Sequence, residues 1–177
     1  MRPAPSLPPP AGVDGCAAVL AYEGVGRELV ARLKYRNARS VVPFLVREMA
    51  ALVGPEPFDV VTWVPTTPAR RRRRGFDQAE VLARAVARRL RTPCRGLLSR
   101  RPGPSQTGRS LAERRHGPVF AARPGVPARV LLVDDVVTSG ATASAAAGSL
   151  RGSGAREVHV VVAARTPTPS AALGGRA

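Results

Sequence analysis

Three apolar segments rich in β-forming residues constrain the fold more than any other feature of this sequence. They span residues 58–64, 130–133 and 157–163, and each is a nearly continuous apolar run. Strands of this kind are buried on both faces, which is typical of parallel sheets. An Ala-rich helical pattern over residues 142–150 separates the second run from the third. The order strand, helix, strand predicts an α/β fold, with a parallel sheet flanked by helices on both faces.

Further elements are expected before and between these segments. Residues 16–22 form a short apolar run that is expected to be a strand. After Gly24-Val-Gly26 comes a helical pattern with Leu29, Val30 and Leu33 on one side. A second helical pattern, around residues 44–52, ends at a Gly54-Pro55 turn. Asp77 is a candidate N-cap, and the helix after it is expected to bury one face. That face carries Val81, Leu82, Ala85, Val86 and Leu90. Residues 99–117 are polar, Arg-rich and contain Pro and Gly, which predicts a long loop.

The chain of 177 residues is long enough for one ordinary core and too short for two. Residues 1–12 and 166–177 are rich in Pro, Gly, Ser and Ala and have no apolar periodicity. We therefore expect one domain over residues 13–165 between two disordered tails. No signal peptide or membrane-spanning run is visible, which makes the cytoplasm the expected location.

The charge balance favours anionic partners. Lys and Arg number 28 against 12 Asp and Glu, a net charge of +16, and Lys34 is the one lysine. A GC-rich genome would produce the same Arg, Ala, Pro and Gly bias without any functional demand. The net charge therefore counts only half as evidence for an anionic partner. The two cysteines, Cys16 and Cys94, are far apart and isolated. This spacing excludes a disulfide framework and argues against a zinc site, so no metal held by protein side chains alone is expected.

The chemistry of the chain concentrates after the second apolar run. Asp134 and Asp135 directly follow the second apolar run, at the point where the loop after a parallel strand binds ligands in folds of this class. The residues that follow offer hydroxyls, backbone N–H groups and a helix start, a pattern suited to a phosphate: Val137, Thr138, Ser139, Gly140, Ala141 and Thr142. Two carboxylates can accept hydrogen bonds from a diol, so the segment predicts a site for a phosphorylated ribose. The alternative is a helix cap beside an ordinary turn.

The segment from Val130 to Thr142 resembles the phosphoribosyl-diphosphate (PRPP) signature of type I phosphoribosyltransferases. A second segment, Val64-Pro65-Thr66-Thr67 followed by five arginines and Gly75-Phe76-Asp77-Gln78, is similar to the ComF/GntX family. The resemblance covers most of residues 20–165. Asp77 stands where the family usually has Asn, and the family's N-terminal cysteine-rich zinc module is missing.

This resemblance implies a role for each segment. Asp134, Asp135 and Arg114 would be catalytic, with Arg109 or Arg114 in a lid over residues 106–115. The diphosphate loop would comprise Pro65, Thr66, Thr67 and Arg74. Lys34 and Tyr35 would line the substrate side, although ordinary surface packing explains them equally. The arginines of residues 70–74 could also neutralise the departing diphosphate. A run of arginines is more often a solvated face, however, so Arg70, Arg71, Arg72 and Arg73 are candidates for contact with solvent or nucleic acid.

Two functions remain open at this point. The first is a PRPP-binding phosphoribosyltransferase that uses Mg²⁺, bound through PRPP, and an unidentified acceptor. The second, implied by the family's association with competence, is a non-catalytic PRPP sensor or single-stranded-DNA-handling accessory of the DNA-uptake machinery. The oligomeric state is also open, a dimer included. Other motifs are weak: Gly24-Val-Gly26 imitates the start of a dinucleotide loop but lacks the third glycine.

Overall fold

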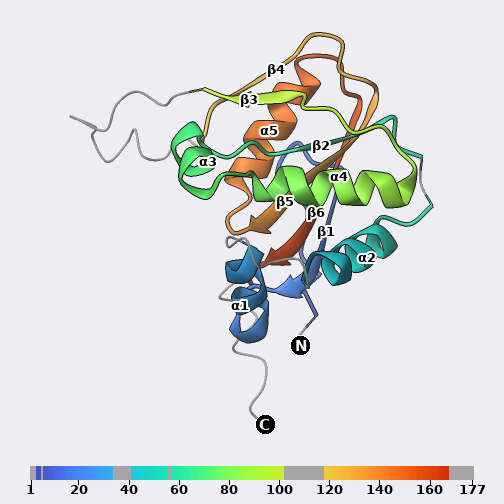
Figure 1. The fold of residues 1–177 in the computed structure, drawn as a ribbon. Helices are drawn as coiled ribbons and strands as arrows, with labels where there is room; N and C mark the ends of the chain where they lie inside the picture. Colours follow the sequence, from blue (N-terminus) through green and yellow to red (C-terminus); the bar gives the residue numbers. More distant parts are fainter. Residues whose placement is uncertain (1–2, 5, 34–40, 56, 102–117, 168–177) are drawn as a thin grey trace.

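A four-stranded parallel sheet forms the centre of the molecule in the computed structural model, which describes residues 3–4, 6–33, 41–55, 57–101 and 118–167. Its strand order is β1-β6-β5-β2 (Figure 1). The strands are β1 (Gly15–Ala21), β6 (Glu157–Arg165), β5 (Arg129–Val137) and β2 (Val60–Trp63). Every neighbouring pair in this sheet is parallel. The predicted α/β class is confirmed.

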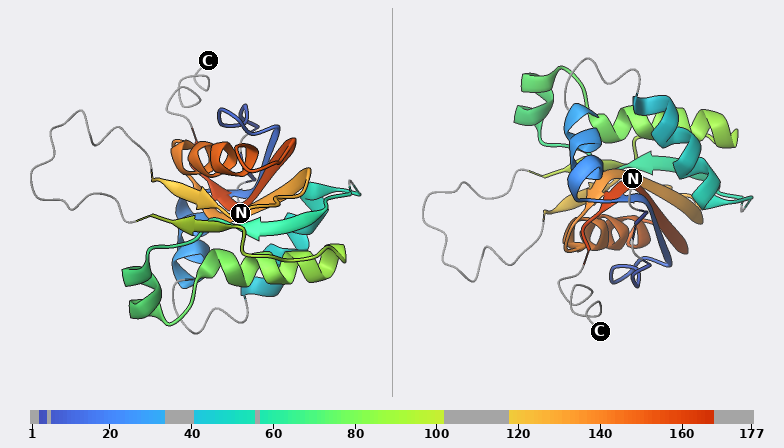
Figure 2. Two further views of the ribbon diagram at one scale, coloured as in Figure 1. Left: turned by 90° about the horizontal axis from the view of Figure 1, so that it is seen from above. Right: turned by 90° about the horizontal axis from the view of Figure 1, so that it is seen from below.

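Helices cover both faces of the sheet, as Figure 2 shows. One face carries α1 (Gly24–Leu33), α2 (Val41–Val53) and α4 (Gln78–Leu90). The other carries α5 (Ala141–Arg151), which packs beside an antiparallel pair made of β3 (Leu98–Arg100) and β4 (Phe120–Ala122). A short helix, α3 (Pro68–Arg74), links the end of β2 to α4.

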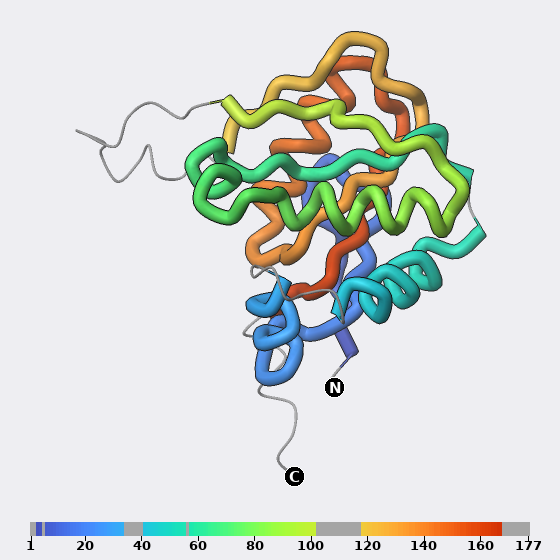
Figure 3. Tube along the Cα trace, in the orientation of Figure 1, coloured from blue at the N-terminus to red at the C-terminus, as the bar shows by residue number. Residues whose placement is uncertain are grey.

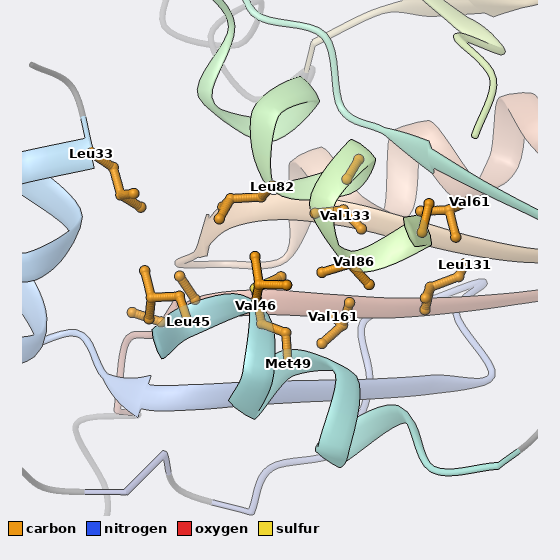
Figure 4. Close-up of a cluster of buried hydrophobic side chains, with 14 of the residues drawn as sticks. Leu33, Leu45, Val46, Met49, Val61, Leu82, Val86, Leu131, Val133 and Val161 are labelled. Atoms are coloured by element: carbon orange, nitrogen blue, oxygen red, sulfur yellow. The ribbon is translucent and has the colours of Figure 1, made fainter. Parts of the chain in front are cut away.

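The core consists of two apolar clusters, one on each side of the sheet. Successive residues of β5 divide between them, because side chains of a strand point alternately to its two faces. Leu131 and Val133 belong to the cluster beneath α2 and α4, drawn in Figure 4, whereas Val130 and Leu132 belong to the cluster beneath α5. The sheet is therefore buried on both faces, as its continuous apolar runs predicted.

Several boundaries differ from expectation. The strand expected over residues 130–133 continues to Val137, so Asp134 and Asp135 lie within β5 and not in the loop after it. Ser99 and Arg100, expected at the start of a loop, belong to β3 and pair with β4. Val81 was expected on the buried face of α4 but is 40% exposed, whereas Ala79, Ala83 and Ala87 are buried in that helix.

The helix α3 was not anticipated, although its signals are present in the sequence. Thr67 is its N-cap and accepts a hydrogen bond from the Arg70 N–H at 3.3 Å, and Pro68 occupies the first turn. Gly75 ends the helix in the left-handed conformation, with φ of 79°. Arginine has a good helix propensity, so the run to which no secondary structure was assigned forms a short helix.

Part of the N-terminal segment packs against the domain. The Arg165 guanidinium donates to the carbonyls of Leu7 and Pro8, and the Val13 N–H donates to the Pro10 carbonyl. The expected disordered tail over residues 1–12 therefore does not describe residues 7–10. The C-terminal tail from residue 168 lies outside the described residues, and the proposed domain limits stay a prediction. Within the described part, no helix is long and apolar enough to cross a membrane.

Candidate functional site

A polar cavity of about 360 Å³ lies at the carboxyl ends of the strands. Parallel strands bring these ends to one edge, which is where open α/β sheets bind ligands. The cavity is lined by Tyr22, Val64, Pro65, Thr66, Arg70, Arg73, Arg74, Asp77, Gln78, Ala79, Arg100, Asp134, Asp135, Val136, Thr138 and Thr142. Segments distant in the sequence therefore contribute to one site.

The acidic pair lies near the end of β5, beside β2. Both carboxylates are partly buried, and the Asp135 N–H donates to Asp134 Oδ1 at 2.8 Å. Burial raises the pKa of Asp134 well above its ordinary value, and the neighbouring carboxylate of Asp135 raises it further. A carboxylate with a raised pKa can contribute to binding in two ways. When ionised it accepts hydrogen bonds from hydroxyl groups, and a nearby cation stabilises its negative charge.

The start of α5 lies at the cavity and contributes two hydroxyl side chains to its lining. Gly140, the N-cap residue, has φ of 81° and gives no side-chain cap to the helix. Thr138 and Thr142 line the cavity on either side of it, while the Ala141 N–H donates to Ser139 Oγ at 3.4 Å. Val137, Ser139, Gly140 and Ala141 do not line the cavity themselves. A Cβ on Gly140 would come within 2.9 Å of Pro10, so this turn requires glycine for space as well as for conformation.

The loop after β2 is fastened to the start of α4 by one carboxylate. Asp77 Oδ2 accepts the Thr66 N–H at 2.8 Å, and Asp77 Oδ1 accepts the Ala79 N–H at 3.1 Å. Burial raises the pKa of Asp77, and the hydrogen bonds from Thr66, Glu80 and Ala79 oppose that rise. The expected N-cap role of Asp77 is confirmed, and the structure adds a second role in shaping the loop. Pro65 and Thr66 line the cavity, whereas Thr67 caps α3.

The arginine run divides into two groups on α3. Arg70, Arg73 and Arg74 line the cavity, whereas Arg71 and Arg72 do not, and Arg71 lies 3.5 Å from Glu80. A further arginine, Arg100 on β3, joins the first group. Burial lowers the pKa of Arg100, and the nearby positive charge of Arg70 lowers it further, against the attraction of Asp134. Four cationic side chains therefore share the cavity with the acidic pair.

Some lining residues escaped sequence reasoning. Arg100 could not be found, because its segment was expected to be a loop and reaches the site only by pairing with β4. Tyr22 follows β1 and lines the cavity, and its position at the end of the apolar run 16–22 was a signal that the sequence offered. Gln78 belongs to the segment that resembles ComF/GntX proteins but was given no role. Arg109, Arg114, Lys34 and Tyr35 lie outside the described residues.

The donor set suits a metal bound mainly by its ligand. Among the described residues, no three His, Cys, Asp or Glu side chains are grouped so as to hold an ion. Asp134 and Asp135 nevertheless present carboxylate oxygens, the donors that Mg²⁺ prefers, and Mg²⁺ is usually held by one or two carboxylates together with substrate phosphates.

The four-stranded parallel sheet with helices on both faces has counterparts among proteins of known structure. Among solved structures, the chain is similar to glutamine PRPP amidotransferase from B. subtilis complexed with ADP and GMP, with 25% identity and a TM-score of 0.51. It is also similar to an allosteric regulatory enzyme of purine biosynthesis, with 24% identity and a TM-score of 0.51. Each alignment covers 75% of this chain but 30% of the other, so the chain corresponds to less than a third of those proteins.

A third similar structure is a purine phosphoribosyltransferase from Pyrococcus horikoshii Ot3, with 15% identity and a TM-score of 0.43. That alignment covers 79% of this chain and 85% of the other. No protein-family model and no curated protein matches the chain. The resemblance to the ComF/GntX family therefore remains a proposal.

Proposed function

We propose that the protein binds PRPP with Mg²⁺ and transfers its phosphoribosyl group to an acceptor. The observation that carries this proposal is the meeting, in one cavity, of Asp134 and Asp135 with Thr138 and Thr142 at the start of α5. The carboxylates suit the ribose hydroxyls, and the helix start suits the 5-phosphate. The fold shared with the PRPP amidotransferase supports the same reading.

The remaining lining residues suit the chemistry of transfer. An acceptor nucleophile would form a bond to C1 of the ribose while the bond from C1 to the diphosphate oxygen breaks, and the electron pair leaves with the diphosphate. Arg70, Arg73, Arg74 and Arg100 can stabilise the departing negative charge. Bound Mg²⁺ would add further charge neutralisation. Arg114 is proposed to assist from residues 106–115.

A double substitution tests this proposal. We expect Asp134→Asn with Asp135→Asn to abolish Mg²⁺-dependent PRPP binding in calorimetric titrations while circular dichroism shows an intact fold, because these carboxylates are assigned to the ligand. Glu28→Gln is the matched control, since Glu28 is an exposed carboxylate on α1, outside the cavity. Unchanged PRPP affinity in the double variant would refute the assigned site.

The finer assignments rest on resemblance. Membership of the ComF/GntX family, a cytoplasmic location and the acceptor are proposals. A panel of nucleobases and amines, assayed for diphosphate release from PRPP, would identify an acceptor. Failure of the whole panel, with PRPP binding intact, would favour a non-catalytic PRPP sensor.

One observation favours a second candidate function. The helix α3 has no buried residue and carries five consecutive arginines, Arg70 to Arg74. An exposed basic helix suits the phosphate backbone of single-stranded DNA, as a DNA-handling accessory in competence would need. Such binding should weaken steeply with salt and should not need the acidic pair.

A further inference from the structure

Gln78 lines the cavity, and of the two polar atoms of its side chain only the oxygen has a hydrogen-bond partner among the described residues. It belongs to the first turn of α4 and is 4% exposed. Its Oε1 accepts a hydrogen bond from Arg74 Nη1 at 3.0 Å. Its Nε2 is buried and has no hydrogen-bond partner within the described residues. Buried amide donors in native proteins are almost always paired, so this one requires an explanation.

The orientation of the carboxamide follows from its partner. A guanidinium can only donate hydrogen bonds, so the atom of Gln78 that meets Arg74 must be the oxygen. The NH₂ group is thereby directed away from Arg74. Rotating the carboxamide would place two donors against each other and leave the oxygen without Arg74. The unsatisfied group of this cavity-lining residue is therefore a hydrogen-bond donor, and its missing partner is an acceptor.

The surroundings indicate what kind of acceptor is missing. Arg70, Arg73 and Arg74 line the cavity along with Gln78, and Asp77, the residue before it, uses both carboxylate oxygens on backbone N–H groups of the protein. A ligand that meets this wall encounters donors and positive charge. An anionic oxygen satisfies both, and a hydrogen bond to a charged acceptor is stronger than one between neutral groups.

We propose that Gln78 Nε2 donates to an oxygen of the diphosphate of PRPP, an inference that rests on the proposed function. The 5-phosphate is assigned to the start of α5, at Thr138 and Thr142, which leaves the diphosphate for the wall formed by α3, α4 and the loop after β2. Gln78 is thereby a ligand-binding residue that completes its hydrogen bonds only when the anion is present.

Inorganic diphosphate and ribose 5-phosphate, each titrated with Mg²⁺ by calorimetry, separate the two ends of the ligand. Gln78→Met retains the length of the side chain and removes the donor. We expect it to weaken binding of inorganic diphosphate and of PRPP about tenfold, as loss of a hydrogen bond to a charged group does. Affinity for ribose 5-phosphate should stay within twofold of the wild type.

Two controls guard against a trivial result. Leu82→Met introduces the same residue into the same helix at a buried position that does not line the cavity, and it should leave all three affinities unchanged. Gln78→Glu keeps the shape and the acceptor for Arg74 but replaces the donor by a negative charge. It should weaken diphosphate binding further than Gln78→Met does.

The outcomes discriminate between this inference and the function on which it rests. A wild-type protein that binds neither PRPP nor diphosphate overturns both. Wild-type binding of PRPP with unchanged diphosphate affinity in Gln78→Met overturns the role of Gln78 alone. Equal losses for ribose 5-phosphate and diphosphate in that variant also overturn it, because they indicate a disturbed cavity and no specific contact.

Discussion

The carboxylate of Asp134 is placed where ionisation is unfavourable. It is partly buried near the end of β5, with the Asp135 carboxylate adjacent in sequence and Asp77 close enough to raise its pKa as well. Such a group lowers the stability of the ligand-free protein, and a bound ligand compensates for that cost. Binding residues are therefore commonly a source of instability. The cost of holding Asp134 ready for a ligand should therefore be measurable in the free protein.

We predict that Asp134→Asn stabilises the ligand-free protein by about 1 kcal/mol at neutral pH. The pKa of Asp134 is higher in the folded protein than its ordinary value of 3.8. The side chain therefore contributes to stability at pH values below 3.8, and this contribution is lost as the pH rises through the raised pKa. Asparagine does not titrate. The advantage of the variant should consequently appear on going from pH 4 to pH 8 in urea denaturation, and an equal advantage at both pH values would contradict this account.

At the residue level, local pattern was sufficient for some positions only. The acidic pair, Thr138, Thr142 and the loop at Pro65 were recognised because their chemistry is contiguous in the chain, and all of them line the cavity. Arg100 was missed because strand pairing brings it there from a segment that appeared irregular. The unpaired donor of Gln78 was invisible for a different reason: a missing partner is a property of packing.

At the level of elements, the helix α3 places the arginines of one run on two different sides. Arg70 and Arg73 are three residues apart and both line the cavity, whereas Arg71 and Arg72 do not. Residues three or four apart lie on one side of a helix, which accounts for this division. A sequence alone does not reveal it unless the helix is anticipated.

We predict different responses from these two arginine pairs. Arg70→Gln with Arg73→Gln should weaken binding of inorganic diphosphate several-fold, with a smaller salt dependence than in the wild type, because both guanidinium groups are lost from the cavity. Arg71→Gln with Arg72→Gln is the charge-matched control and should change that affinity less than twofold. Filter binding of single-stranded DNA should fall for both pairs. Equal loss of diphosphate affinity in the two variants would show that only net charge matters.

The start of α1 shows why the sequence contains Gly24-Val-Gly26, the motif that resembles the beginning of a dinucleotide-binding loop. A Cβ on Gly26 would collide with the backbone carbonyl of Ala21, so this glycine allows α1 to approach the end of β1. The glycines of Gly24-Val-Gly26 therefore serve backbone geometry: Gly24 has φ of 45° and Gly26 provides close contact. Phosphate binding need not be invoked for this motif.

Two glycine substitutions should have opposite effects on stability. Gly26→Ala is expected to cost about 1–3 kcal/mol, because the added methyl group overpacks a backbone contact. Gly148→Ala, in an exposed position of α5 where a Cβ meets no atom within 4 Å, should stabilise the protein by about 0.5–1 kcal/mol. Thermal unfolding of both variants measures the difference. Destabilisation by Gly148→Ala would contradict this prediction, because it would show that the added methyl group collides with other atoms of the folded protein.

For the molecule as a whole, the class of fold was predictable and its topology was not. Continuous apolar runs predicted a sheet buried on both faces, because such segments have no face suited to water. The order β1-β6-β5-β2 depends on which strands dock beside one another, and nothing local in the runs encodes that choice. The pair β3 and β4 escaped prediction for the same reason.

The position of β6 has a consequence for how the chain acquires its structure during synthesis. This strand is the last one among the described residues yet lies inside the sheet, between β1 and β5, as Figure 3 shows. β1 pairs with β6 along most of its length, and among the described residues its one further bridge is to Pro3. At ordinary translation rates, β1 must wait on the order of ten seconds for its partner. During that interval β1 lacks the strand it pairs with, and the backbone groups on that edge have no partner in the sheet.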